Sequence, residues 1–123
     1  MKFIHIIIYF LFILSCKSAG DTKDGNNCVE NTEFKEKFFY HFNYIENNIS
    51  VLQDSKFKES VIFISNYAPV STNNIMNYSR TYPIGIFEKD RIKILEWYEE
   101  NKCNNIQFKS TYIIPDAYKD YEN

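Results

Sequence analysis

An apolar run near the N-terminus decides which part of this chain can form a folded domain. Residues Phe3 to Leu14 are apolar apart from His5, and Lys2 precedes them with a positive charge. A helix of these residues rises about 18 Å, whereas a spanning helix must cross a hydrocarbon core of roughly 30 Å. The run is therefore too short to span a bilayer and is typical of an export signal that is later removed. We expect the fold to be built from the residues that follow it.

The end of this run resembles the lipobox, the site at which lipoprotein signal peptidase cuts. The family pattern has an aliphatic residue three positions before the cut, a small residue directly before it and an invariant cysteine after it. Ile13-Leu14-Ser15-Cys16 fits at its last two positions, while Ile13 replaces the commoner leucine and Leu14 is bulkier than usual. The resemblance implies a signal peptide over residues 1–15. It also implies a lipid on Cys16, by which the mature chain is held at a membrane of the cell envelope.

A second processing route stays open. Ser18 and Gly20 satisfy the small-residue rule of ordinary signal peptidase, with a cut before Asp21 that would release a secreted soluble protein. If Cys16 is acylated instead, the outer membrane is the expected location, because Lys17 provides no clear retention signal. The leaflet stays open.

The number of cysteines also points to export. Three cysteines would leave one free thiol in an oxidising compartment. Acylation of Cys16, or cleavage after Gly20, removes the surplus and leaves Cys28 and Cys103 as a natural pair. A disulfide between positions 75 apart would stabilise the fold by roughly 4 kcal/mol in the chain-entropy model. The alternative is a pair of unbonded, buried thiols.

The length and charge of the mature chain restrict its organisation and partners. From Cys16 onward it has 108 residues, enough for one domain. Residues 16–27 are polar and small, like a flexible tether; 28–114 form the single globular domain, and 115–123 look like a frayed tail. Without Lys2, 13 basic side chains face 16 acidic ones, a formal charge of −3. A mildly acidic chain lacks the excess of basic residues that attracts nucleic acid, so no nucleic-acid partner is expected.

Apolar residues at helical spacing predict a mainly α fold. The three segments run from Glu33 to Asn48, from Ser55 to Ala68 and from Glu88 to Lys102. Residues 34–45 also alternate like a strand, and residues 60–67 are rich in strand-forming side chains, so helix and strand both stay open there. The expected fold is a small single α or α+β domain with about three helices.

The third segment has the clearest helical pattern. Ile92, Leu95 and Tyr98 make its expected apolar seam, and Asp90 with Lys93 makes a surface ion pair at i,i+3 spacing. This seam should face the core.

The connections between these segments carry the weaker structural predictions. Residues 70–87 are rich in Ser, Thr, Asn and Tyr, and connections of this length are uncommon unless they are functional. A binding loop is therefore expected here. Alternating apolar residues predict a short strand over residues 82–86 and a terminal strand over residues 106–112.

The closing helix carries a second resemblance. It ends in Trp97-Tyr98-Glu99-Glu100-Asn101-Lys102, after an apolar helix and a connection rich in Asn, Tyr and Ser. Over residues 55–105 this arrangement is similar to small uncharacterised lipoproteins of the Bacteroidetes type. The resemblance implies a compact, mainly helical domain and brings no known catalytic residue.

The residues that carry most enzyme chemistry are sparse. His41 is the single histidine after the leader, and it lies among aromatic residues with no serine or cysteine motif beside it. We expect it to flank or join the core. One histidine with Cys28 and Cys103 does not make a zinc site, and there is no glycine-rich phosphate loop. No metal or cofactor is expected, and the chain is interpreted as a non-enzyme.

Three carboxylates keep a hydrolase open as an alternative. Glu96 with Glu99 or Glu100 could supply the acid and base of glycoside hydrolysis if the pair lay in a cleft. Their spacing instead predicts an exposed helix face.

Aromatic residues are unusually abundant, with 11 Phe, 10 Tyr and one Trp. Exposed rings stack on sugars or anchor protein partners. The candidates for such binding are Tyr78, Tyr82, Trp97 and Tyr98. The competing interpretation is that these rings fill the core of a small domain, although we expect Tyr78 or Tyr82 to be exposed on its loop.

The function expected from these features is a membrane-anchored, non-enzymatic interaction protein of the inhibitor or immunity type, with a protein partner. A glycan- or cell-wall-binding module is the first alternative, motivated by the residues from Asn73 to Tyr82. The hydrolase is the second.

Overall fold

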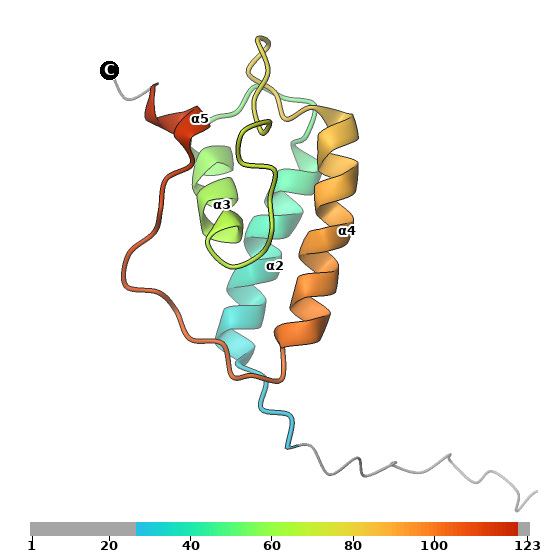
Figure 1. The fold of residues 1–123 in the computed structure, drawn as a ribbon, viewed down its shortest axis with the longest axis vertical. Coiled ribbons are helices and arrows are strands. Elements are labelled where there is room, and N and C mark those ends of the chain that lie inside the picture. Colours follow the sequence, from blue (N-terminus) through green and yellow to red (C-terminus); the bar gives the residue numbers. More distant parts are fainter. Residues whose placement is uncertain (1–26, 121–123) are drawn as a thin grey trace, which may run out of the picture.

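The computed structural model describes residues 27–120, which fold into a mainly helical domain, as predicted. The predicted signal peptide, Cys16 and the tether up to residue 26 lie outside the described residues. The helices are α2 (Thr32–Asn47), α3 (Ser55–Ser65), α4 (Ile84–Asn101) and the short α5 (Asp116–Lys119). In Figure 1, α2 lies between α3 and α4, and the three run side by side. Within residues 27–120, no helix combines the length and the apolar character that crossing a membrane requires.

Helix α2 confirms the first predicted helix and excludes the strand alternative for residues 34–45. Asn31 caps it: its side-chain oxygen accepts a hydrogen bond from the backbone N–H of Phe34 at 3.1 Å. One face is buried over the full length of the helix, through Phe34, Phe38, His41, Phe42 and Ile45.

Helix α3 confirms the second predicted helix over most of its length. Asp54 caps it by accepting a hydrogen bond from the N–H of Phe57 at 2.7 Å. The helix ends at Ser65, three residues before the predicted end, because residues 66–68 form a turn ahead of Pro69. Among the described helices, α2 and α3 approach each other most closely.

Helix α4 begins four residues earlier than predicted, so residues 84–86 are helical and the expected short strand over residues 82–86 is wrong. Pro83 is its N-cap residue, and the carbonyl of Pro83 accepts from the N–H of Phe87 at 2.9 Å. Proline fits the start of a helix, where an N–H would have no intrahelical acceptor.

The face that α4 turns to the core also differs from the predicted seam. Its buried residues are Phe87, Asp90, Ile94 and Tyr98, while Ile92 is more than half exposed. Asp90 is a core residue rather than one half of a surface pair with Lys93. The core as a whole is formed by Phe34, Phe38, Phe42, Ile45, Phe57, Val61, Phe63, Ile64, Ala68, Ile75, Tyr82, Phe87, Ile94, Tyr98 and Tyr118.

The predicted terminal strand over residues 106–112 does not form; this segment is irregular. Its backbone is held by side chains instead. Asn31 donates to the carbonyl of Ile106 at 2.7 Å, the Tyr67 hydroxyl accepts from the N–H of Lys109 at 2.8 Å, and the Asn66 side chain accepts from the N–H of Ile113 at 2.8 Å. Polar groups of this backbone therefore find their hydrogen-bond partners in side chains at the ends of α2 and α3, and no neighbouring strand is needed.

The interpretation of residues from 115 onward as a frayed tail is wrong for Pro115–Lys119. Pro115 is buried and is the N-cap residue of α5, whose Tyr118 is 3 % exposed. The Tyr118 hydroxyl donates to the side-chain oxygen of Gln53 at 2.6 Å. The globular domain therefore extends beyond its predicted end at residue 114.

Candidate functional site

A disulfide lies at the end of the domain where the described residues begin. Cys28 and Cys103 are bonded, with an S–S distance of 1.98 Å and a Cα–Cα distance of 4.4 Å, as predicted. Beside them, Val29 and Asn104 form an isolated parallel bridge. The first described residues are therefore fastened to the segment that follows α4, immediately before the chain starts α2.

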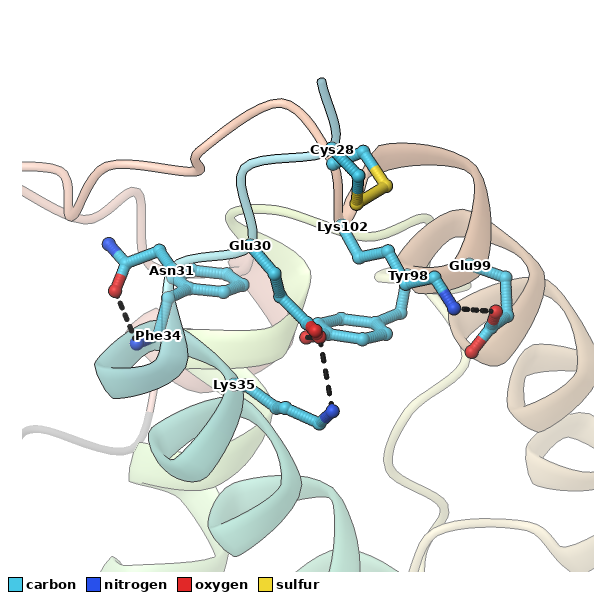
Figure 2. A network of polar contacts seen from close by, with 9 residues as sticks. Cys28, Glu30, Asn31, Phe34, Lys35, Tyr98, Glu99 and Lys102 are labelled. Atoms are coloured by element: carbon cyan, nitrogen blue, oxygen red, sulfur yellow. Dashed lines mark hydrogen bonds and ion pairs between the residues drawn. A yellow bond between two sulfur atoms is a disulfide. The ribbon is translucent and has the colours of Figure 1, made fainter. Parts of the chain in front are cut away.

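Polar contacts continue this connection into the helices (Figure 2). The Tyr98 hydroxyl of α4 donates to Glu30 at 2.6 Å, and Lys35 of α2 lies 3.2 Å from the same carboxylate. The hydrogen bond from Tyr98, followed by the contact with Lys35, lowers the pKa of Glu30. Burial, and then the bond to Glu30, raises the pKa of Tyr98. We call Cys28, Glu30, Tyr98 and Cys103 the tether clasp.

The connection between α3 and α4 is fixed from inside for most of its length. Ile75 and Tyr82 are buried, and the side-chain nitrogen of Gln53 donates to the carbonyl of Ile75 at 2.6 Å. Asp90 of α4 accepts from the Ser71 N–H at 3.0 Å, from the Ser71 hydroxyl at 2.7 Å and from the Tyr82 hydroxyl at 2.5 Å. The expected binding loop is thus mostly anchored to the core.

One short turn of this connection stands clear of the domain, formed by residues 77–81. The Asn77 side chain accepts from the N–H of Thr81 at 3.0 Å and donates to its hydroxyl at 3.0 Å, and Arg80 has a φ of 56°. Tyr78 is fully exposed in this turn, which confirms that one of the two loop tyrosines is accessible. Figure 1 shows the turn projecting at the end of the bundle opposite residues 27–31.

Other exposed apolar side chains lie at that same end. Val51 and Leu52 precede α3, and Ile84 opens α4; all three are more than half exposed. The segment 48–54 and the first turn of α4 both lie at the end from which residues 77–81 project (Figure 1). The Gln53 N–H donates to the carbonyl of Arg80 at 2.9 Å, which ties Leu52 to the turn. We call Val51, Leu52, Tyr78 and Ile84 the distal surface.

The other three predicted binding rings do not belong to this surface. Tyr82 and Tyr98 are 3 % and 2 % exposed, so neither ring is available as a binding surface and the competing interpretation, in which these rings fill the core, holds for both. Both direct their hydroxyl groups to carboxylates, and burial, followed by those bonds, raises the pKa of each phenol. Trp97 is partly buried and stacks on Phe38 with centroids 5.8 Å apart.

His41 is a core residue, as expected, and has a partner that its sequence position did not reveal. Its Nδ1 lies 2.9 Å from the Ser60 hydroxyl oxygen, and its ring stacks on Phe63 at 4.5 Å. Ser60 is 0 % exposed, so this hydroxyl cannot reach a substrate and the pair is no accessible nucleophile and base. Burial is the largest cause that lowers the pKa of His41.

A cavity of about 420 Å³ lies beside this histidine, between α2, α3 and the C-terminal segment. Its apolar wall comes from Ile62, Phe63 and Ile114. Lys37 and Lys58 also line it, and their ammonium groups lie over aromatic rings: 5.5 Å from the centroid of Phe63 and 5.8 Å from that of Tyr118.

The three candidate carboxylates, Glu96, Glu99 and Glu100, are exposed on α4, as their spacing predicted. Glu99 pairs with Lys102 at 2.5 Å. Within residues 27–120, no group of three or more His, Cys, Asp or Glu side chains is arranged to hold a metal ion.

Three polar residues that organise these sites escaped sequence reasoning: Gln53, Ser60 and Asp90. Each is buried and forms its hydrogen bonds with residues distant in the chain. The sequence carried one local sign of this burial, at Asp90. Its position falls at helical spacing on the same face of α4 as Phe87, Ile94 and Tyr98, which are apolar or aromatic.

Comparison with known proteins gives no family to which the chain can be assigned: no family model matches it, and neither a curated protein nor a solved structure does.

Proposed function

We propose that this protein is a membrane-anchored interaction module that presents its distal surface to a protein partner in the cell envelope. The observation that carries this proposal is the arrangement of the two ends. The tether clasp holds the N-terminal segment at one end, and the projecting turn of residues 77–81 lies at the other (Figure 1). An anchor at Cys16 would direct Tyr78 away from the membrane.

The composition of the distal surface favours a protein over a glycan as the partner. A tyrosine among aliphatic side chains is typical of protein-binding patches, in which aromatic rings supply much of the binding energy. Glycan recognition by stacking usually needs a platform of rings, and Tyr78 is the one ring among the four residues of the distal surface, since Tyr82 of the same connection is buried. An inhibitor or immunity-type role fits a small, cross-linked domain that carries exposed apolar side chains at the end opposite the disulfide.

Site-specific photo-crosslinking in the native envelope tests the partner. A crosslinker at Leu52 should give one adduct of defined mass, and Tyr78→Ala should weaken the interaction, and lower the adduct yield at limiting partner, about thirtyfold, since a central ring contributes about 2 kcal/mol to an interface. A crosslinker at Glu100, exposed on the side of α4, is the matched control and should give no such adduct. Equal adducts from both positions, or insensitivity to Tyr78→Ala, would refute the proposal.

The anchor is tested separately by the intact mass of the mature protein from its membrane. Acyl chains on Cys16 are expected, together with the loss of two hydrogens for the Cys28–Cys103 bond. An unmodified N-terminus at Asp21 would leave a secreted soluble protein instead.

A further inference from the structure

The cavity beside His41 has a feature that the distal surface does not need: a nearly buried histidine, one of whose ring nitrogens forms no hydrogen bond within the described residues. His41 is 4 % exposed, and its Nδ1 is bonded to Ser60. No hydrogen bond engages its Nε2 within residues 27–120, and no buried side-chain nitrogen or oxygen there lacks a partner. The Nε2 atom must therefore be open to the cavity that His41 lines.

The serine decides which nitrogen of His41 carries the proton. The Ser60 side chain is fully buried, and Nδ1 is the single hydrogen-bond partner of its hydroxyl in the described part of the chain. If Nδ1 were the donor, the hydroxyl hydrogen would be buried without an acceptor, at a cost of about 1–3 kcal/mol. The hydroxyl therefore donates to Nδ1, and the proton of the neutral ring sits on Nε2.

The open Nε2–H is thus a fixed donor at the wall of the cavity. Among the described residues that line the same space, Lys37 from α2 and Lys58 from α3 carry a positive charge and Glu59 carries a negative one. A donor with an excess of positive charge favours a ligand that brings an anionic acceptor. The apolar wall of Ile62, Phe63 and Ile114 favours a ligand with an apolar body, and a volume of about 420 Å³ is within the range of small-molecule sites.

We infer that this cavity binds a carboxylate carried on a small apolar body, with the carboxylate between His41 Nε2–H and the ammonium groups of Lys37 and Lys58. A free organic acid and the C-terminus of a peptide share this chemistry. The inference is independent of the proposed function, because none of the residues that form the distal surface lines the cavity.

Titration of the purified full-length chain, followed by the NMR signals of the His41, Phe63 and Tyr112 rings, tests the inference. The probe is phenylpropionate, and its amide is the control of the same shape without charge. An acetylated dipeptide that ends in a phenylalanine carboxylate distinguishes a peptide terminus from a free acid. Phenylpropionate should shift these signals and bind about tenfold more tightly than the amide, as expected for a charge-assisted contact.

Variants then assign the contacts. Lys37→Met with Lys58→Met should lower the affinity for phenylpropionate about tenfold and leave that for the amide unchanged. Lys93→Met, which removes an exposed lysine on α4 away from the cavity, should change neither. His41→Phe with Ser60→Ala removes the donor and its partner together, and should weaken acid and amide alike.

Two results would overturn the inference. One is equal affinity for the acid and the amide, or no shift of the three rings with either the acid or the peptide. The other is unchanged acid binding in the Lys37→Met, Lys58→Met variant, which alters only lysines at the cavity and keeps the test valid even if the His41 variant fails to fold.

Discussion

Asp90 is the residue on which the connection between α3 and α4 depends most. It is 1 % exposed and accepts three hydrogen bonds, two from Ser71 and one from Tyr82. A buried carboxylate is tolerated only when its oxygens are satisfied in this way. Through these bonds Asp90 holds both the start of the connection, at Ser71, and its end, at Tyr82, against α4.

Replacing Asp90 with alanine should lower the free energy of unfolding by about 3 kcal/mol, because the Tyr82 hydroxyl would stay buried, and the Ser71 donors partly buried, without an acceptor. Urea denaturation followed by circular dichroism measures the change. Glu88→Ala, on the exposed face of the same helix, should stay within about 0.5 kcal/mol of wild type. A similar small effect at Asp90 would show that these contacts contribute little.

His41 should make the stability depend on pH. Burial holds its pKa below the ordinary value of 6.5. As the pH falls through 6.5, the unfolded chain takes up a proton that the folded ring resists, so the free energy of unfolding should decrease. Denaturation at neutral and at mildly acidic pH should show this decrease in wild type and a smaller one in His41→Phe with Ser60→Ala. An unchanged slope in that double variant would assign the effect elsewhere.

At the level of single residues, the sequence predicted apolar contacts better than polar ones. His41 was expected in or beside the core because aromatic residues surround it, but its bond to Ser60 joins two helices and leaves no trace in local spacing. Asp90 was expected on the surface because charged residues are rarely buried. The predicted seam of α4 included Ile92, which is exposed, and left out Asp90, which is buried.

Among the elements, the helices were predictable and the segments without regular structure were not. Periodicity identified α2, α3 and α4 because each buries one face over its length. Alternation over residues 106–112 looked like a strand, but alternating side chains need a neighbouring strand to complete the backbone bonds. Here Asn31, Tyr67 and Asn66 supply those bonds from their side chains.

Helix α5 is expected to stabilise the domain despite its length of four residues. Tyr118→Ala should cost about 3 kcal/mol, since it removes a buried ring and leaves Gln53 without its donor. Tyr118→Phe keeps the ring and should cost about 1 kcal/mol. Lys119→Ala, at an exposed position, is the control and should have little effect. Thermal unfolding would rank the three variants, and equal midpoints would mean that α5 is not packed in solution.

For the whole molecule, the disulfide should supply a large part of the stability. Replacing both cysteines with serine should lower the free energy of unfolding by roughly 4 kcal/mol, because the unfolded chain regains the conformational entropy that closing the loop between Cys28 and Cys103 removes. Denaturation with and without reductant should give the same difference for wild type. The double variant, which has no bond to reduce, should not respond to reductant. A response there would point to an effect of the reductant unrelated to this bond.

The bond between Cys28 and Cys103 also determines how the domain would respond to a mechanical load. If a partner pulled on residues 77–81 while the N-terminus was held, tension would pass from Cys28 directly into the C-terminal end of α4. Helix α4 begins next to the pulled turn and runs to the opposite end of the bundle (Figure 1). The force would therefore act along the axis of α4. Helix α2, which follows Cys28 in the chain, would not carry the load and would not be separated from its neighbours.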